Sequence, residues 1–328
     1  MVADVLETVA DTAADIAVIG AAVVWPNRPA QMQMLEQRYH LHRLDLAADP
    51  DALLAAVGGR VRAVVTSHGG GFPKHLLDRL PRLEIVASSG VGVDTLCVAD
   101  CHARGIPVTH TPDVLTEDVA DMGLLLLATV RRLLPAERWV RQGLWQKRGM
   151  MPLNRSVTGK KLGIVGLGRI GKAIARRAEA FGMAVCYYGR RRQEGVDYPW
   201  YDDLVQLARE VDILMPVLPG GEQTRGIISA EVLRALGPGG YFVNIARGSV
   251  VDEPALVALL QQGGLAGAGL DVFADEPRVP AALLDLDNVV LQPHCASGTE
   301  ETRGAMAQLV VDNLAAHFAG RPLLTPVG

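Results

Sequence analysis

Cysteine is scarce in this sequence, and the few cysteines show none of the spacings typical of metal or redox sites. The 328 residues include four, Cys97, Cys101, Cys186 and Cys295, with no C-x-x-C pair among them. So sparse a set argues against a disulfide-stabilised secreted domain and indicates reduced thiols in a cytoplasmic protein. Cys97 and Cys101 lie one helical turn apart with no histidine cluster beside them, so we interpret them as core residues and expect no metal site.

The sequence also lacks an excess of one charge sign and any apolar run long enough to cross a membrane. Lys and Arg number 32 against 36 Asp and Glu, a formal charge of −4, so no basic field exists to hold nucleic acid or an anionic membrane. The most apolar stretch, residues 122–130, falls far short of the roughly 20 residues that a membrane helix needs. The first residues carry acids where a signal peptide needs basic side chains. We therefore expect a soluble, cytoplasmic protein.

What the sequence contains is a regular alternation of short β-branched runs and longer helical patterns. In the first third, the predicted strands are Ile16–Val24, Val61–Thr66, Leu83–Ser88 and Ile106–Thr109. The predicted helices between them are Gln31–Tyr39, Asp51–Val57, Pro73–Leu80 and Leu96–Arg104. This rhythm predicts an α/β fold with a parallel sheet and helices on its faces. A longer helix, Thr116–Leu133, follows, and the segment Trp139–Val157 then interrupts the rhythm.

A second series begins at Lys161. Its predicted strands are Leu162–Val165, Ala184–Tyr188, Ile213–Val217, Tyr241–Ile245, Ala268–Val272 and Val289–Leu291. Its predicted helices are Ile170–Phe181, Tyr201–Arg209, Ala230–Leu236 and Glu253–Gln262, and one more helix, Glu300–Phe318, follows. Six strands with right-handed crossovers make a complete dinucleotide-binding sheet. We therefore expect a nucleotide domain at 111–297 and a second domain made of 1–110 plus 298–328.

The first strand of the second series runs into a glycine-rich turn, Gly166-x-Gly168-x-x-Gly171, which opens a helix. The bare pattern is weak, because a chain with 35 glycines often contains it by chance. The strand before it and the amphipathic helix after it match the dinucleotide-binding fingerprint. Gly166 permits the tight turn, Gly168 lets the backbone approach a pyrophosphate, and Gly171 lets the helix pack close to the strand. A glycine-rich turn with no nucleotide is the alternative.

The end of the next strand indicates which dinucleotide is bound. An NAD site places Asp or Glu there to accept the ribose hydroxyls, whereas this sequence reads Tyr188-Gly189-Arg190-Arg191-Arg192. The guanidinium groups of Arg190 and Arg191 would bind a 2′-phosphate through charge-assisted hydrogen bonds. We therefore expect NADP(H) to be preferred over NAD(H), and an ordinary solvated basic turn is the alternative.

Three further polar segments follow later strands of the same series, and they contain Arg247, Glu276 and His294. Ligands of parallel sheets bind at the carboxyl ends of the strands, so these three side chains could converge. Each alone has an ordinary interpretation, as a surface arginine, a solvated acidic turn or a loop histidine.

Six motifs in a fixed order carry a resemblance that covers essentially the whole chain. They are SSGVGVD at Ser88–Asp94, TPDVLTEDVAD at Thr111–Asp121, GLGRIG at Gly166–Gly171, NIARGSVVDE at Asn244–Glu253, GLDVFADEP at Gly269–Pro277 and QPHCASGT at Gln292–Thr299. The sequence thereby resembles the D-isomer-specific 2-hydroxyacid dehydrogenases, and its closing NLAAHFAGRPLLTPV is similar to the branch of glyoxylate, hydroxypyruvate and hydroxyphenylpyruvate reductases. The resemblance implies two Rossmann-like or flavodoxin-like doubly wound parallel-sheet domains with a cleft between them. It also implies a discontinuous substrate domain, an NADP-binding domain and a homodimer with an arm at about residues 135–158.

The roles that the resemblance implies suit reduction of a small 2-oxo acid, such as glyoxylate or hydroxypyruvate, to a D-2-hydroxy acid. Arg247 would bind the carboxylate and polarise the carbonyl, His294 would donate a proton to the carbonyl oxygen, and Glu276 would favour the protonated imidazole. Asp271 would help to orient the nicotinamide amide. The implied cofactor contacts are Gly166, Gly168, Arg169, Ile170, Gly171, Arg190, Arg191, Pro219, Thr224, Ile245, Ala246, Asp271 and Ser297. The implied substrate contacts are Gly69, Gly70, Val91, Gly92, Arg247 and His294.

Other interpretations stay open at this point. A dinucleotide-sensing corepressor of the same fold would keep the arginine, glutamate and histidine, and other family members oxidise formate or phosphite or reduce larger 2-oxo acids. Formate dehydrogenases pair their histidine with glutamine, so Glu276 argues against that activity. Cys295 is interpreted as packing, because hydride transfer needs no thiol nucleophile. Trp145 lies in the arm, where it could cover the neighbour's active site or simply pack in an interface.

Overall fold

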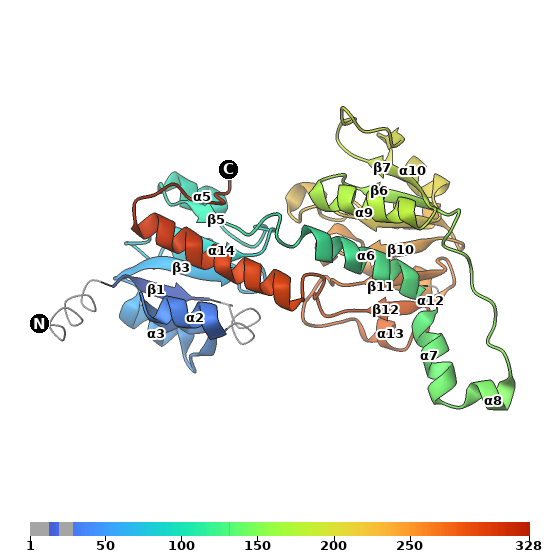
Figure 1. Cartoon of the computed structure of the whole chain (residues 1–328), viewed down its shortest axis with the longest axis horizontal. Coiled ribbons are helices and arrows are strands. Elements are labelled where there is room, and N and C mark those ends of the chain that lie inside the picture. Colours follow the sequence, from blue (N-terminus) through green and yellow to red (C-terminus); the bar gives the residue numbers. More distant parts are fainter. Residues whose placement is uncertain (1–12, 20–28, 131) are drawn as a thin grey trace, which may run out of the picture. The chain divides into compact units, whose positions relative to one another are not determined.

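The structure, a computed structural model, describes residues 13–19, 29–130 and 132–328. The chain divides into two compact units, Met1–Leu115 with Gly298–Gly328, and Thr116–Ser297. Residues 111–115 join the first unit rather than the second, because Thr111 exchanges two hydrogen bonds with Gly90, of 2.8 and 2.9 Å. Each unit is built on a parallel sheet with helices around it, which confirms the predicted α/β fold class (Figure 1). The N-terminal residues that bear on a signal peptide lie outside the described ranges.

The sheet of the first unit has the strand order β2-β1-β3-β4-β5, and all its pairs are parallel. Its strands are β1 (Asp15–Val18), β2 (His40–Arg43), β3 (Val61–Ser67), β4 (Ile85–Ser89) and β5 (Val108–Thr109). The helices are α2 (Pro29–Glu36), η3 (Leu44–Leu46), α3 (Pro50–Val57), α4 (Lys74–Leu77), α5 (Val98–Ala103) and the returning α14 (Glu300–Phe318).

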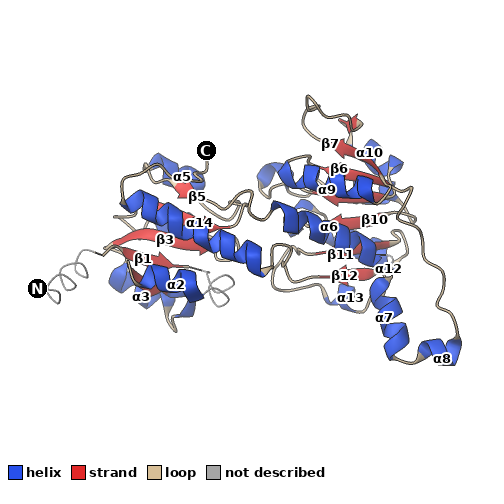
Figure 2. Ribbon diagram, in the orientation of Figure 1, coloured by secondary structure: helices blue, strands red, loops and turns tan. Residues whose placement is uncertain are grey.

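Alternate side chains of the central strands pack into two separate cores on the two faces of this sheet. Ala63 and Val65 face the core shared with α2 and α14, whereas Val64 faces the core shared with α3, α4 and α5. Helices α2 and α14 lie along one face of the sheet (Figure 2). Because both faces are covered, β3 reads as a nearly continuous apolar run rather than as an alternating one.

The sheet of the second unit has the order β12-β11-β10-β9-β6-β7-β8 and is parallel throughout. Its strands are β6 (Lys161–Val165), β7 (Ala184–Tyr188), β8 (Trp200–Tyr201), β9 (Ile213–Pro216), β10 (Tyr241–Asn244), β11 (Gly267–Leu270) and β12 (Val289–Leu291). The helices are α6 (Thr116–Val130), α7 (Leu133–Arg141), α8 (Leu144–Arg148), α9 (Arg169–Ala180), α10 (Leu204–Glu210), η4 (Glu222–Thr224), α11 (Ala230–Leu236), η5 (Gly248–Val250), α12 (Glu253–Gln261) and α13 (Ala281–Leu284). The chain winds outward from β6 to β7 and β8, returns to β9, and then winds the other way. This reversal between β6 and β9 is the place where such sheets bind ligands.

Two edge strands contradict the sequence prediction. β2 has the polar sequence HLHR and pairs only with β1, so it lacks the apolar, β-branched pattern of a central strand. β8 has two residues and extends the predicted six-stranded sheet to seven. The helix predicted at Tyr201–Arg209 begins at Leu204 instead, because the Asp203 carboxylate accepts hydrogen bonds from two amides of the first turn, at 2.8 and 3.2 Å.

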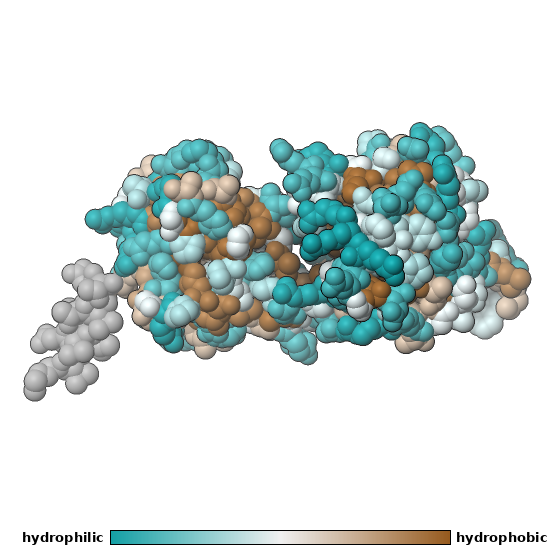
Figure 3. Space-filling view, turned by 90° about the horizontal axis from the view of Figure 1, so that it is seen from above, coloured by the Kyte–Doolittle hydropathy of each residue, from teal (hydrophilic) through white to brown (hydrophobic). Residues whose placement is uncertain are grey.

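The arm, residues 135–158, contains helices that the sequence does not predict. The expected helix Thr116–Leu133 ends at Val130, and α7 starts after Arg132, which has a left-handed φ of 66°. The apolar arm side chains Leu153 and Met150 are 95 % and 80 % exposed. Figure 3 shows smaller apolar areas interspersed among polar ones on the face that it draws. Of the strand predicted at Ile16–Val24, β1 covers Asp15–Val18, and residues 20–24 lie outside the described ranges. Among the described helices, none is long and apolar enough to cross a membrane.

Candidate active site

The predicted cofactor and catalytic residues of the second unit all follow the carboxyl end of a strand. They come after β6 (Gly166 to Gly171), β7 (Arg190, Arg191), β9 (Pro219, Thr224), β10 (Ile245, Ala246, Arg247), β11 (Asp271, Glu276) and β12 (His294, Ser297). Because the sheet is parallel, all six loops emerge at one edge of it (Figure 1). Motifs that are far apart in the sequence therefore lie at the same end of the sheet.

The glycine-rich turn has the geometry that a pyrophosphate requires. Gly166 has a φ of 101°, in the region that favours glycine, and a Cβ on Gly171 would lie 2.5 Å from the carbonyl oxygen of Gly166. A Cβ on Gly168, in contrast, would meet no atom within 4 Å, so open space lies beside the N-cap of α9. Arg169 and Ile170 form the first turn of that helix, whose amide groups and dipole favour an anion. The residues present thus fit a dinucleotide phosphate.

The turn after β7 is tied to the glycine-rich turn by Gln193, a residue that the sequence did not single out. Its side-chain Nε2 donates to the Leu167 carbonyl at 2.7 Å, and its backbone amide donates to the buried Tyr187 hydroxyl at 2.8 Å. Arg190 and Arg191 are exposed beside it, and within the described residues no ion pair engages them. Both guanidinium groups are therefore available at the end of β7, next to the phosphate-binding turn.

The loops after β9 and β10 are shaped by polar side chains that bond to their own backbone. The Thr224 hydroxyl donates to the Pro219 carbonyl at 2.8 Å. Asn244, which is fully buried and was not singled out from the sequence, accepts from the Ala246 amide at 3.0 Å and donates to the Arg247 carbonyl at 2.9 Å. The half-buried Arg247 guanidinium is fixed by a 2.7 Å bond from Nη1 to the Ala246 carbonyl. Ile245 and Ala246 are buried.

Asp271 holds the loop that carries His294. The residue is 1 % exposed, and its carboxylate accepts the amides of Cys295 at 2.8 Å and Ala296 at 3.0 Å, while its carbonyl accepts the His294 amide at 2.8 Å. These three bonds support the left-handed φ of 51° at His294, an unusual angle for a residue with a side chain. Burial raises the pKa of Asp271 above its usual value. Asp271 thus supports the loop that carries His294, and Ser297 directly follows the residues bound to its carboxylate. In the same loop, the Cys295 thiol donates to the Gln292 side chain at 3.1 Å.

His294 and Glu276 form a hydrogen-bonded pair. Nδ1 of His294 lies 2.7 Å from Oε2 of Glu276, and Oε1 of Glu276 accepts the Phe273 amide at 3.0 Å. A carboxylate only accepts hydrogen bonds, so Nδ1 carries a proton. Nε2 is then the ring nitrogen that could exchange a proton with a substrate. The side chains are 34 % and 29 % exposed, which leaves the imidazole within reach of a small molecule. A Cβ at Gly248 would lie 1.9 Å from the backbone of Phe273, so the Arg247 loop packs directly against the Glu276 loop.

The expected substrate contacts of the first unit follow two neighbouring strands. Gly69 and Gly70 come after β3, and Val91 and Gly92 come after β4, with Ser67 and Ser89 paired in register. Across the described chain, no hydrogen bond engages the amide groups of Gly69, Val91 and Gly92. The structure therefore brings these two loops together at one edge of the first sheet, where their N–H groups can bind an anion.

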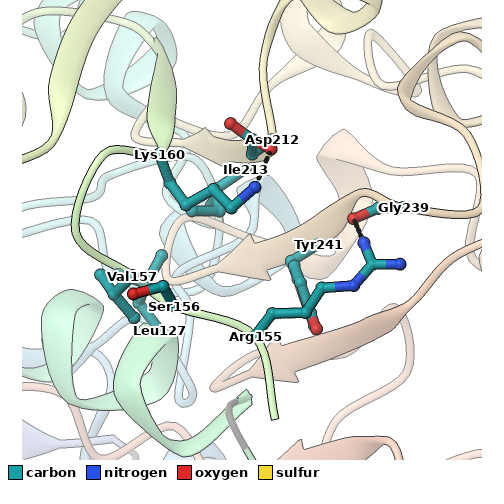
Figure 4. Close-up of a pocket in the computed structure, with 9 residues that line it drawn as sticks. All are labelled: Leu127, Arg155, Ser156, Val157, Lys160, Asp212, Ile213, Gly239 and Tyr241. Carbon is teal, nitrogen blue, oxygen red and sulfur yellow. Dashed lines mark hydrogen bonds and ion pairs between the residues drawn. The ribbon is translucent and has the colours of Figure 1, made fainter.

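A pocket at the opposite edge of the second sheet lies away from the loops that follow the strands of that sheet. Figure 4 shows it at the amino-terminal ends of β6, β9 and β10, where Lys160 pairs with Asp212 at 2.9 Å and Arg155 donates to the Gly239 carbonyl at 2.9 Å. None of the predicted site residues lines it. The pocket is therefore separate from the candidate site.

Comparisons with known proteins show which family this chain resembles. The family described as D-isomer specific 2-hydroxyacid dehydrogenase, NAD binding domain, matches residues 123–296. A hydroxyphenylpyruvate reductase of Plectranthus scutellarioides is 47 % identical over 94 % of this chain and 99 % of its own, and glyoxylate/hydroxypyruvate reductase A of Arabidopsis thaliana is 48 % identical with the same coverage. Among solved structures, the NADPH-dependent glyoxylate/hydroxypyruvate reductase of Sinorhizobium meliloti, in complex with NADP and malonate, is 45 % identical, covers 97 % of each chain and has a TM-score of 0.87.

Proposed function

The chain belongs to the D-isomer specific 2-hydroxyacid dehydrogenase family and is therefore an oxidoreductase, and we propose that it reduces small 2-oxo acids to D-2-hydroxy acids with NADPH. Glyoxylate and hydroxypyruvate are the substrates we favour. The names of one relative, from Arabidopsis thaliana, and of the solved Sinorhizobium meliloti structure support this choice.

The observation that carries the proposal is the 2.7 Å pair of His294 and Glu276. When bound, the reduced nicotinamide supplies a hydride to the carbonyl carbon. The imidazolium of His294 would give its Nε2 proton to the carbonyl oxygen in the same reduction, and solvent would restore that proton afterwards. The Glu276 carboxylate accepts the bond from Nδ1 and so fixes the orientation of the ring. Hydride and proton together convert the 2-oxo acid into the 2-hydroxy acid.

The remaining polar groups would hold the substrate by its negative charge. The Arg247 guanidinium offers a planar fork to the carboxylate and to the adjacent carbonyl oxygen, whose charge grows during reduction. The amides of Gly69, Gly70, Val91 and Gly92 would bind the carboxylate from the first unit.

A cofactor swap tests the choice of NADPH. We expect that replacing Arg190 and Arg191 by Ala weakens NADPH binding by about a hundredfold, the lower end for two charge-assisted bonds because both side chains are exposed. Adding Gly189→Asp should raise the affinity for NADH by a smaller factor. A Cβ at Gly189 would have only ordinary contacts of 3.6 Å or more. As a control, alanines at Arg209 and Arg234, which are exposed near the amino edge of the same sheet, remove the same charge. They should leave the affinity for both cofactors unchanged. A wild type that already prefers NADH would contradict the assignment of Arg190 and Arg191.

A dinucleotide-sensing corepressor is the rival function. Both proteins would bind NADPH, so binding alone does not separate them. Loss of NADPH absorbance on addition of glyoxylate or hydroxypyruvate, at a rate proportional to enzyme, supports the reductase. Tight NADPH binding with no oxidation by any member of a panel that extends to hydroxyphenylpyruvate would favour the corepressor.

We also propose a homodimer built on the arm. Leu153, Met150 and Trp145 are 95, 80 and 59 % exposed, and a second copy would bury such apolar side chains. Sedimentation of the wild type and of a variant with Asp at Leu153 and Met150 tests this, and a wild-type monomer at micromolar concentration would contradict it.

A further inference from the structure

The Val91–Gly92 loop of the first unit is held by the two residues that follow β5. The Gly90 amide donates to the Thr111 hydroxyl at 2.9 Å, and the Thr111 amide donates to the Gly90 carbonyl at 2.8 Å. One residue earlier, Nδ1 of His110 lies 3.1 Å from the Val91 carbonyl. Three hydrogen bonds therefore fix three consecutive peptide units, the last of which contains the Gly92 amide.

The partner of His110 determines its protonation at one nitrogen. A carbonyl oxygen only accepts, so Nδ1 of His110 must carry a proton, in the neutral ring or in the imidazolium. The peptide unit that joins Val91 to Gly92 contains both the Val91 carbonyl and the Gly92 N–H. Hydrogen bonding to the carbonyl polarises that unit and strengthens the N–H at its other end as a donor.

The main chain of His110 is anchored independently of its side chain. Its amide donates to the Thr325 carbonyl at 3.2 Å, and its carbonyl accepts the Thr325 hydroxyl at 2.6 Å. Thr325 is in turn held by Asn313 of α14, which is 1 % exposed and donates to the Thr325 hydroxyl at 2.9 Å. A substitution of the imidazole therefore leaves the backbone at residue 110 in place.

We propose that His110 is a positioning residue for the substrate carboxylate, acting through the Val91–Gly92 peptide. This inference rests on the proposed function, in which the Gly92 amide binds the carboxylate of the 2-oxo acid. His110 orients that amide and strengthens it, and the C-terminal segment around Thr325 holds His110 where it can do so. Because His110 acts through this peptide unit, it contributes to substrate affinity and not to the chemical step.

Substitutions that differ in one donor test the role. His110→Phe keeps a ring and removes the donor, and His110→Asn restores an N–H. The KM for glyoxylate should rise about three- to tenfold in His110→Phe, the loss expected for one ordinary hydrogen bond, with kcat within about twofold. His110→Asn should recover most of that loss. His102→Phe, at an exposed histidine of α5, makes the same change away from the loop and should match the wild type.

Binding of oxamate, a 2-oxo acid analogue that is not reduced, gives a readout without turnover. The affinity for oxamate, measured by calorimetry with NADPH present, should fall in His110→Phe by the same factor as KM rises. Equal oxamate affinity in the wild type and His110→Phe, or a fall in kcat with KM unchanged, would overturn the positioning role. A wild type that reduces no 2-oxo acid but binds oxamate more tightly than His110→Phe would refute the proposed function and support the positioning role.

Discussion

Alanine at Gly168 and at Gly171 should separate cofactor binding from folding, because the two glycines have different surroundings. A Cβ at Gly168 would meet no atom within 4 Å, whereas a Cβ at Gly171 would lie 2.5 Å from the Gly166 carbonyl oxygen. The backbone of Gly168, with φ −78° and ψ −160°, is open to alanine. We expect Gly168→Ala to fold like the wild type and bind NADPH poorly, and Gly171→Ala to lose stability as well.

The magnitudes follow from these distances. At Gly168, alanine is a poorer N-cap than glycine by up to about 1 kcal/mol, and it regains about 0.4–1 kcal/mol by restricting the unfolded chain, so Tm should change by no more than about 2 °C. Its methyl group would displace the pyrophosphate, and losing one bond of about 1.5–3 kcal/mol weakens NADPH binding by roughly 10- to 100-fold. At Gly171, helix α9 must move away from the turn, which costs about 1–3 kcal/mol and lowers Tm by roughly 2–12 °C.

Thermal unfolding without cofactor and a fluorescence titration with NADPH measure the two effects separately. Gly59→Ala is the matched control, because a Cβ there also meets nothing within 4 Å and the residue lies in the first unit. It should change neither Tm nor NADPH affinity. Wild-type NADPH affinity in Gly168→Ala would refute the placement of the pyrophosphate. A Tm of Gly171→Ala equal to the wild type would refute the packing argument.

Four other substitutions test the catalytic residues and one ion pair. His294→Ala should lower kcat by about 10²–10⁴ while NADPH affinity stays within about twofold, and an undiminished kcat would exclude His294 as the proton donor. Arg247→Lys should raise the KM for glyoxylate and lower kcat, since an ammonium lacks the bidentate fork, and unchanged constants would contradict its role. Glu276→Gln should lower kcat, because a neutral amide is a weaker acceptor for the Nδ1 proton and holds the ring less firmly; an undiminished kcat would disprove the pairing. Burial acts to raise the pKa of Asp212, but the Lys160 ammonium holds it below its usual value of 3.8, so the stability advantage of the wild type over Asp212→Asn should be full at neutral pH and disappear as the pH falls below that value. Urea midpoints across pH measure this difference, and a constant difference would contradict it.

Buried elements were predictable because burial leaves a pattern along the sequence. The bounds of β7, β12 and α14 agree with the predictions residue for residue. β2 was not predictable, since HLHR at a sheet edge has one apolar residue and pairs with a single strand. The break between α6 and α7 was also missed, because an arginine at a φ of 66° has no local signature.

The residues of the candidate site also include some that the sequence predicts and some that it does not. Glycines at fixed spacing and strand-end motifs indicated the loops, because each has a local chemical reason that can be read from consecutive residues. Gln193, Asn244 and His110 were missed, since their roles depend on which backbone groups the fold brings beside them. The one signal visible in the sequence is Asn244, an asparagine that closes the apolar strand Tyr241–Asn244.

Deuteride transfer from labelled NADPH to a prochiral 2-oxo acid is the most direct test of the proposed reductase activity. The purified protein is incubated with hydroxypyruvate and NADPH deuterated at C4 on the transferred face, and the product is analysed by chiral chromatography and mass spectrometry. We expect D-glycerate with one deuterium at C2, formed in equal amount to the NADP⁺ produced, and strongly reduced formation by His294→Ala. Formation of the L isomer, absence of deuterium from C2, or no NADPH oxidation with any 2-oxo acid would contradict it.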